Sequence, residues 1–140
     1  MKKNGQPSWS NILRIFLQLV AVHSFVVGVG LIIMPTNLLD YLGFHGCTER
    51  FFPTQGGVFH IVMAIGYLMA ASKSNKYECM IIFSIIVKMC ATLFLLTYYI
   101  FVAQTLMILF SGITDCIMGI IIWQLYSKTK YTKENNLNEE

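Results

Sequence analysis

The sequence predicts an all-α integral membrane protein, a four-helix bundle whose N- and C-termini lie on the cytoplasmic side. The first observation is composition: 56% of the 140 residues are hydrophobic, 12% are charged, and the mean hydropathy is +0.62, whereas soluble domains carry about 25% charged residues. The second is a set of four apolar runs, each long enough to cross about 30 Å of hydrocarbon. The third is a one-sided distribution of Lys and Arg. Together they exclude an ordinary cytosolic enzyme, a nucleic-acid-binding module and a disordered chain.

The apolar runs divide the chain into three parts. A cytoplasmic N-terminus (1–11) precedes the membrane domain (12–126), and a cytoplasmic polar tail (127–140) follows it, with residues 132–140 expected to be disordered. At about 1.5 Å per residue, each run can span a bilayer as a helix. The predicted spans cover residues 12–34, 54–72, 79–101 and 104–126.

The first span resembles a secretory signal peptide because Lys2, Lys3 and Arg14 lie near its start. Its apolar run exceeds the usual length of about 7 to 15 residues. It also ends at Met34-Pro35 without a cleavage site of small residues. We therefore expect this span to remain as a membrane anchor.

The connections between the spans differ in length. Only Val102 and Ala103 separate spans three and four, so these spans are expected to form a tight antiparallel hairpin. Spans one and two are separated by an external connection, 35–53, in which Leu, Phe and Tyr are mixed with charged residues. That mixture predicts a short interfacial helix or a cap on the helix ends, with a binding lid as the alternative.

Lys and Arg in the loops and at the span ends cluster on one side of the predicted bundle, and the positive-inside rule places that side in the cytoplasm. Arg50 is the single Lys or Arg in the external connection. Trp and Tyr residues near the span ends are expected in the interfacial aromatic belts. The clustered residues are Lys2, Lys3, Arg14, Lys73, Lys76, Lys128, Lys130 and Lys133, and the belt residues are Trp9, Tyr77, Tyr98, Tyr99, Trp123 and Tyr126.

A weak internal repeat relates the second span to the fourth. Apolar helices of similar composition match easily, so the repeat suggests a duplicated two-helix hairpin without establishing it. The aligned pairs are Gly57 with Gly112, His60 with Asp115, Met63 with Met118, and Ile65 with Ile120.

Each predicted span contains one ionisable residue in its interior, in chain order His23, His60, Lys88 and Asp115. Counted from the cytoplasmic end, all four lie roughly 14 to 18 Å deep, near the midplane. A charged side chain at that depth costs on the order of 2.5 to 3.5 kcal/mol. Lys88 and Asp115 lie about equally far from the hairpin turn, so we expect them to face the bundle interior and form an ion pair.

Polar residues extend these positions into an inward-facing seam. Residues three or four apart are neighbours on a helix, so hydroxyl groups one turn away share a face with Lys88 and with Asp115. Tyr67 lies two turns after His60 on the same face. Small residues recur at helix-packing spacing on the second and fourth spans. The candidate ligand or proton site comprises His23, His60, Tyr67, Lys88 and Asp115, the structural seam comprises Ser84, Thr92, Ser111 and Thr114, and the small residues are Gly66, Ala70, Gly112 and Gly119.

Three interpretations of these buried polar residues are open. A buried Lys/Asp pair with His neighbours can specify helix register at a cost in stability. The same residues can form a midplane site that binds a ligand or handles protons, because histidine titrates near a pH of about 6.5. The third interpretation is membrane catalysis, which no motif supports: the chain has no H-E-x-x-H, no G-x-S-x-G, no P-loop and no C-x-x-C. No catalytic residue and no metal site is predicted.

Several short sequence features accompany the four spans. They are Arg14, Leu42-Gly43-Phe44 in the connection after Pro35, Gly56-Gly57-Val58-Phe59-His60 through Gly66-Tyr67, Lys88, and Asp115 with Met118-Gly119. In this pattern the chain resembles the small bacterial four-helix membrane proteins of the DoxX-like and BphX-like kind, over about residues 12–126. The resemblance implies a four-helix fold in the bacterial inner membrane and implies no particular activity.

The leading functional hypothesis is a small integral membrane accessory or solute-interacting protein with a midplane Lys/Asp/His site. The alternatives are a proton-linked transporter or channel-like subunit, and a membrane-embedded enzyme acting on a lipid or quinone, although the missing motifs favour a protein that is not an enzyme. The expected partners are the lipid bilayer and either a second copy or another membrane protein, with no nucleic acid. The sequence leaves any cofactor undetermined.

Overall fold

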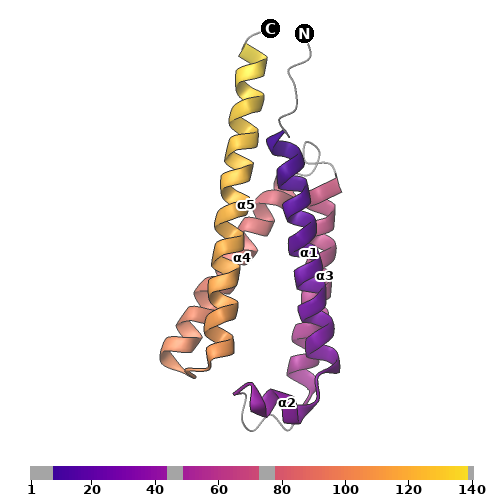
Figure 1. The fold of residues 1–140 in the computed structure, drawn as a ribbon, viewed down its shortest axis with the longest axis vertical. Helices are drawn as coiled ribbons and strands as arrows, with labels where there is room; N and C mark the ends of the chain where they lie inside the picture. The colour runs from indigo at the N-terminus through magenta and orange to yellow at the C-terminus, as the bar shows by residue number, and fades with distance from the viewer. Residues whose placement is uncertain (1–7, 44–48, 73–77, 139–140) are drawn as a thin grey trace.

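The computed structural model describes residues 8–43, 49–72 and 78–138, and within them the chain is entirely helical apart from short connections (Figure 1). Four of the helices are long and apolar enough to cross a membrane. The predicted all-α class with four apolar helices is therefore confirmed. The helices are α1 (Trp9–Ile33), α2 (Thr36–Tyr41), α3 (Phe51–Ser72), α4 (Glu78–Phe101) and α5 (Leu106–Asn138). Predictions about Lys2, Lys3, Phe44, Lys73, Lys76 and Tyr77 lie outside the described residues.

Two helices begin earlier than predicted, α1 at Trp9 rather than residue 12 and α3 at Phe51 rather than residue 54. The start of α1 is set by Ser8, whose hydroxyl accepts from the backbone N–H of Asn11 at 3.4 Å. Such a side-chain cap satisfies one of the free N–H groups of a first turn. Pro53 lies in the first turn of α3, where its missing N–H removes no hydrogen bond.

α5 is longer than predicted, because the helix continues through the polar tail to Asn138. The expectation of disorder from residue 132 onward is therefore wrong for residues 132–138. Extending an existing helix adds one backbone hydrogen bond per residue without a new nucleus. The hydroxyls of Thr129 and Thr132 also donate to backbone carbonyls one turn earlier, at 2.8 and 2.9 Å. Polar composition ends the apolar span here, but it does not end the helix.

The connection between α1 and α3 contains the short helix predicted for it, α2. Leu39 is buried in the protein, whereas Tyr41 is exposed. Gly43 follows with φ +92°, a conformation that L-residues with a side chain rarely adopt. The hydroxyl of Thr105, the residue before α5, donates to the carbonyl oxygen of Gly43 at 3.3 Å. This hydrogen bond ties the connection between α1 and α3 to the turn between α4 and α5.

The four long helices form two antiparallel pairs, α1 with α3 and α4 with α5 (Figure 1). Smaller contacts of α1 with α5 and of α3 with α4 join the two pairs. Among the described residues α1 does not pack on α4, nor α3 on α5. The helices therefore form a ring in the order α1, α3, α4, α5.

The two pairs converge at one end and diverge toward the other (Figure 1). We call these the converging end, where α3 ends and α4 begins, and the diverging end, where α2 and the α4–α5 turn lie. At the converging end, Lys128 Nζ lies 4.4 Å from the centroid of the Trp9 ring, and the Tyr126 hydroxyl donates to Glu78. The hydrophobic core joins all four long helices toward this end and comprises Leu13, Leu17, Val20, Ala21, Tyr67, Ala70, Ala71, Ile81, Met118 and Ile122.

Glycines set the close approach of α1 and α3. A Cβ on Gly57 would lie 2.5 Å from the carbonyl oxygen of Gly28, so the two backbones touch. Gly112 and Gly119 approach α4 as predicted, although their nearest neighbours there are side-chain atoms. Gly66 makes no such approach, because a Cβ there would meet only Met80 Cε at 3.8 Å. Gly28 was not among the small residues selected from the sequence, because its pairing with Gly57 depends on how two separate helices pack.

Candidate functional site

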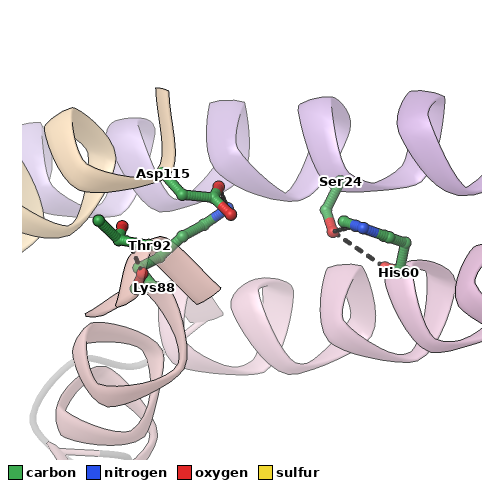
Figure 2. Close-up of polar contacts among 5 residues, drawn as sticks. All are labelled: Ser24, His60, Lys88, Thr92 and Asp115. Atoms are coloured by element: carbon green, nitrogen blue, oxygen red, sulfur yellow. Dashed lines mark hydrogen bonds and ion pairs between the residues drawn. The ribbon is translucent and has the colours of Figure 1, made fainter. Parts of the chain in front are cut away.

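The ion pair of Lys88 and Asp115 lies between α4 and α5, as the sequence predicts. Lys88 Nζ donates to Asp115 Oδ1 at 2.5 Å, and only 3% of Lys88 and 9% of Asp115 is exposed. Figure 2 shows the two side chains reaching toward one another. A Cβ on Gly119 would lie 3.2 Å from the Cβ of Lys88, so this glycine allows α5 to come close to the lysine.

The hydroxyl residues of the predicted seam fall into two groups. Ser84 and Thr92 are buried and donate to the backbone carbonyls of Met80 and Lys88, at 2.7 and 2.8 Å. Such bonds satisfy a hydroxyl within its own helix. Ser111 and Thr114 are exposed on α5. Within the described residues, none of these four hydroxyl groups hydrogen-bonds to the side chain of Lys88 or Asp115. The ion pair therefore has further hydrogen-bonding groups that the seam does not engage.

Tyr67 of α3 completes the cluster around the lysine. Lys88 Nζ lies 5.5 Å from the centroid of its ring, within the range of a cation–π interaction. Only 2% of Tyr67 is exposed, and its hydroxyl has no hydrogen bond within the described part of the chain. No fully buried side-chain N or O atom of the described residues lacks a partner. The Tyr67 hydroxyl is therefore not completely enclosed, although the residue as a whole is buried.

His60 belongs to a second polar contact, between α1 and α3. The hydroxyl of Ser24 donates to the backbone carbonyl of His60 at 3.0 Å, and the same oxygen lies 3.3 Å from His60 Nδ1. Because the hydroxyl proton is used by the carbonyl, the ring nitrogen must donate to Ser24 Oγ. This assignment places the proton of a neutral imidazole on Nδ1. Figure 2 shows this contact separated along α1 from the Lys88–Asp115 pair.

His23 stands apart from both contacts. Its side chain is exposed, although it lies within electrostatic range of Lys88 and Asp115. The structure thus brings Lys88, Asp115 and Tyr67 into one cluster and assigns His60 to another. The two histidines make no hydrogen bond or ion pair with the cluster in the described structure, but both lie within electrostatic range of Lys88 and Asp115.

Ser24 is the polar residue that the sequence analysis did not select. It is buried, with 2% exposed, and it is the hydrogen-bond partner of His60. A usable sequence signal was present, because Ser24 lies one helical turn before Gly28 in a small-xxx-small pattern. Such a pattern marks close helix contacts, and hydroxyl groups at those contacts can bond across to the neighbouring helix.

The cluster can bind polar groups but is not arranged to hold a metal ion. Among the described residues, no group of three His, Cys, Asp or Glu side chains is placed to coordinate one. What the cluster offers is a buried ammonium group, a carboxylate and a phenol. Comparisons with protein-family models, with curated proteins and with solved structures find no match to this chain.

Proposed function

We propose that this chain is a small multi-pass protein of the bacterial inner membrane, of the DoxX-like kind, that binds a small polar solute at Lys88, Tyr67 and Asp115. One observation carries the proposal. The buried Lys88 has three N–H donors and uses one of them in a hydrogen bond to Asp115. The neighbouring Tyr67 hydroxyl makes no hydrogen bond within the described residues. Unused donors in a membrane interior are costly unless a solute or water satisfies them.

A purely structural ion pair would not explain why Tyr67 lies beside Lys88. Register can be specified by Lys88 and Asp115 alone, since they connect α4 to α5. Tyr67 is on α3, in the other helix pair, and its ring faces the ammonium group. The cluster therefore includes residues of both helix pairs. The Tyr67 hydroxyl, which has no hydrogen bond within the described residues, lies where the two pairs meet.

The binding test compares the full chain with two variants in lipid nanodiscs. We expect at least one solute from a panel of small neutral and anionic molecules, including acetamide and acetate, to raise the Tm of the parent. Replacing Lys88 with Met and Asp115 with Leu together removes the polar groups while keeping apolar side chains in their place, and Tyr67→Phe removes only the hydroxyl. Both variants should lose the response. A parent that responds to no solute, or a double variant that responds equally, would reject the binding function.

The proposed orientation has both termini in the cytoplasm. Its support is the distribution of Lys and Arg, together with Trp9, Tyr126 and Lys128 at the converging end, where interfacial anchors are expected. A labelling map of intact cells tests it, with Cys47 modified by a reagent that cannot cross the membrane. Labelling of Cys47 from the cytoplasm only, or termini on opposite sides, would refute the orientation.

A proton-linked transporter or channel-like subunit is the second candidate. The observation in its favour is the difference between the two ends of the molecule, joined by core packing at one and divergent at the other (Figure 1). A pathway would have to open the converging end, where the Lys128–Trp9 and Tyr126–Glu78 contacts lie. Solute flux into proteoliposomes distinguishes this candidate from simple binding.

A further inference from the structure

The free acceptor sites of the cluster are the remaining lone pairs of the Asp115 carboxylate and of the Tyr67 oxygen. Three donors are also free within the described residues, namely two N–H groups of Lys88 and the O–H group of Tyr67. Tyr67 is 2% exposed and its ring lies beside the ammonium group. A ligand that matches this set presents acceptor oxygens, and an ammonium group binds charged oxygens more strongly than neutral ones.

Charge sets a second condition on the ligand. Lys88 and Asp115 cancel one another, so an added anion would leave one uncompensated negative charge in a buried site. Such a charge is strongly disfavoured in a protein or membrane interior. A proton on Asp115 removes it, and the side chain of Asp115 is the more accessible of the two, 13% exposed against 4% for Lys88.

We infer that the site takes a small carboxylic acid as an anion and a proton together. The acid gives its proton to the carboxylate of Asp115, and its own carboxylate accepts hydrogen bonds from the N–H groups of Lys88 Nζ that Asp115 leaves free. Protonated Asp115 and the Tyr67 hydroxyl then both donate to the bound anion. No net charge enters the site, and the transferred proton is the one that the acid releases. This inference rests on the proposed function and names its solute class.

Other titratable groups face the cluster and compete for the proton. Lys88 contributes from α4 and Tyr67 from α3, while His60 on α3 and His23 on α1 lie within electrostatic range. A protonated histidine would also balance the charge of the anion. His60, however, is engaged with Ser24, and His23 is exposed outside the cluster. Asp115 is the carboxylate that already contacts Lys88 Nζ, which makes it the nearest acceptor for the proton of the acid.

The test measures the binding of acetate to the full chain in nanodiscs by calorimetry. Two buffers with different ionisation enthalpies give the number of protons taken up with each acetate. We expect one proton per acetate, and a Kd for acetate that rises tenfold for each unit of pH above neutrality. Acetate binding without proton uptake would overturn the inference. Binding of acetamide but not acetate would also overturn it while leaving the proposed binding function intact, whereas binding of neither would reject both.

Variants identify the proton acceptor. Asp115→Asn carries a permanently neutral side chain, so it should bind acetate without proton uptake and without the pH dependence. Because this variant loses its ion pair, its Tm is measured with and without acetate, and acetate should stabilise it more than it stabilises the parent. Asp40→Asn removes an exposed carboxylate of α2 and is the matched control, which should keep one proton per acetate. Loss of proton uptake in His60→Gln but not in Asp115→Asn would overturn the assignment to Asp115.

Discussion

The two helix pairs have the same register but use different chemistry. One constant shift in residue number carries Ser24 of α1 onto Lys88 of α4, and it also carries Ile32 onto Leu96. A second constant shift carries His60 of α3 onto Asp115 of α5, and it also carries Gly57 onto Gly112. The equivalent residues make equivalent contacts in the two helix pairs. The Ser24–His60 contact corresponds to the Lys88–Asp115 contact, and the close packing of Ile32 on Gly57 corresponds to that of Leu96 on Gly112. The weak repeat in the sequence thus corresponds to a repeated pattern of helix contacts.

The difference lies in what fills the equivalent positions. Gly28 lets the α1 and α3 backbones touch, whereas the equivalent Thr92 of α4 carries a buried hydroxyl that bonds to the Lys88 carbonyl. The first pair is held by backbone contact and a neutral hydrogen bond, and the second by an ion pair between side chains. Backbone contacts cannot adjust, but an ion pair changes with protonation. The α1–α3 pair is therefore suited to be a scaffold, and the α4–α5 pair is suited to respond to charge.

The strongest challenge to this comparison is removal of one ionic partner. Asp115→Ala leaves Lys88 buried without a counter-charge, and we expect a loss of about 3 to 5 kcal/mol in the free energy of unfolding. The double variant with Lys88→Met should recover much of that loss, because no unpaired charge remains. Chemical denaturation in detergent measures both. Strictly additive effects of the two single changes would mean that the residues do not interact.

Equivalent glycines should differ in their tolerance of a methyl group. Gly57→Ala places a Cβ 2.5 Å from a backbone oxygen, so we expect a loss of about 1 to 3 kcal/mol in unfolding free energy. Gly112→Ala places one 3.1 Å from the Leu96 Cδ2 atom, which can move, and should cost less. Gly30→Ala meets nothing within 4 Å and is the control. Equal effects at positions 57 and 112, measured by thermal unfolding, would remove the distinction between the pairs.

The neutral hydrogen bond of the first pair should contribute less than the ion pair of the second. Ser24→Ala leaves the carbonyl and ring of His60 without their partner, and interhelical hydrogen bonds in membranes average about 0.6 kcal/mol. We expect a decrease in unfolding free energy of about that size. A decrease as large as that of Asp115→Ala would show that the α1–α3 pair depends on polar contacts as much as α4–α5 does.

The smallest effect is expected where the α1–α3 connection meets the α4–α5 turn. Thr105→Val keeps the shape of the side chain and removes its hydrogen bond to Gly43. We expect a loss of about 0.5 to 1 kcal/mol in unfolding free energy. Faster hydrogen exchange confined to α2 and the turn would support a local tie. Changes spread through both helix pairs would show that they depend on this bond to stay together.

Composition and periodicity predict most of this fold, because long apolar helices are specified locally. The Lys88–Asp115 pair was also predictable, since a tight turn fixes the depth of both residues on adjacent helices. The contact of Ser24 with His60 was not, because α1 and α3 are joined by a long connection that leaves their register undetermined. For the same reason, the sequence did not predict the close approach of Gly28 to Gly57 or the separation of the histidines from the ion pair. Register between helices is a property of packing rather than of either helix alone.

The length of α5 has a mechanical consequence. Its 33 residues extend about 50 Å, well beyond the roughly 30 Å thickness of a hydrocarbon layer. Asp115 and Tyr131 lie on this one continuous helix, about 24 Å apart. A tilt of roughly 10° about Asp115 would therefore displace Tyr131 by about 4 Å. A small reorientation of α5 at the buried carboxylate would therefore be amplified at the polar end of the same helix.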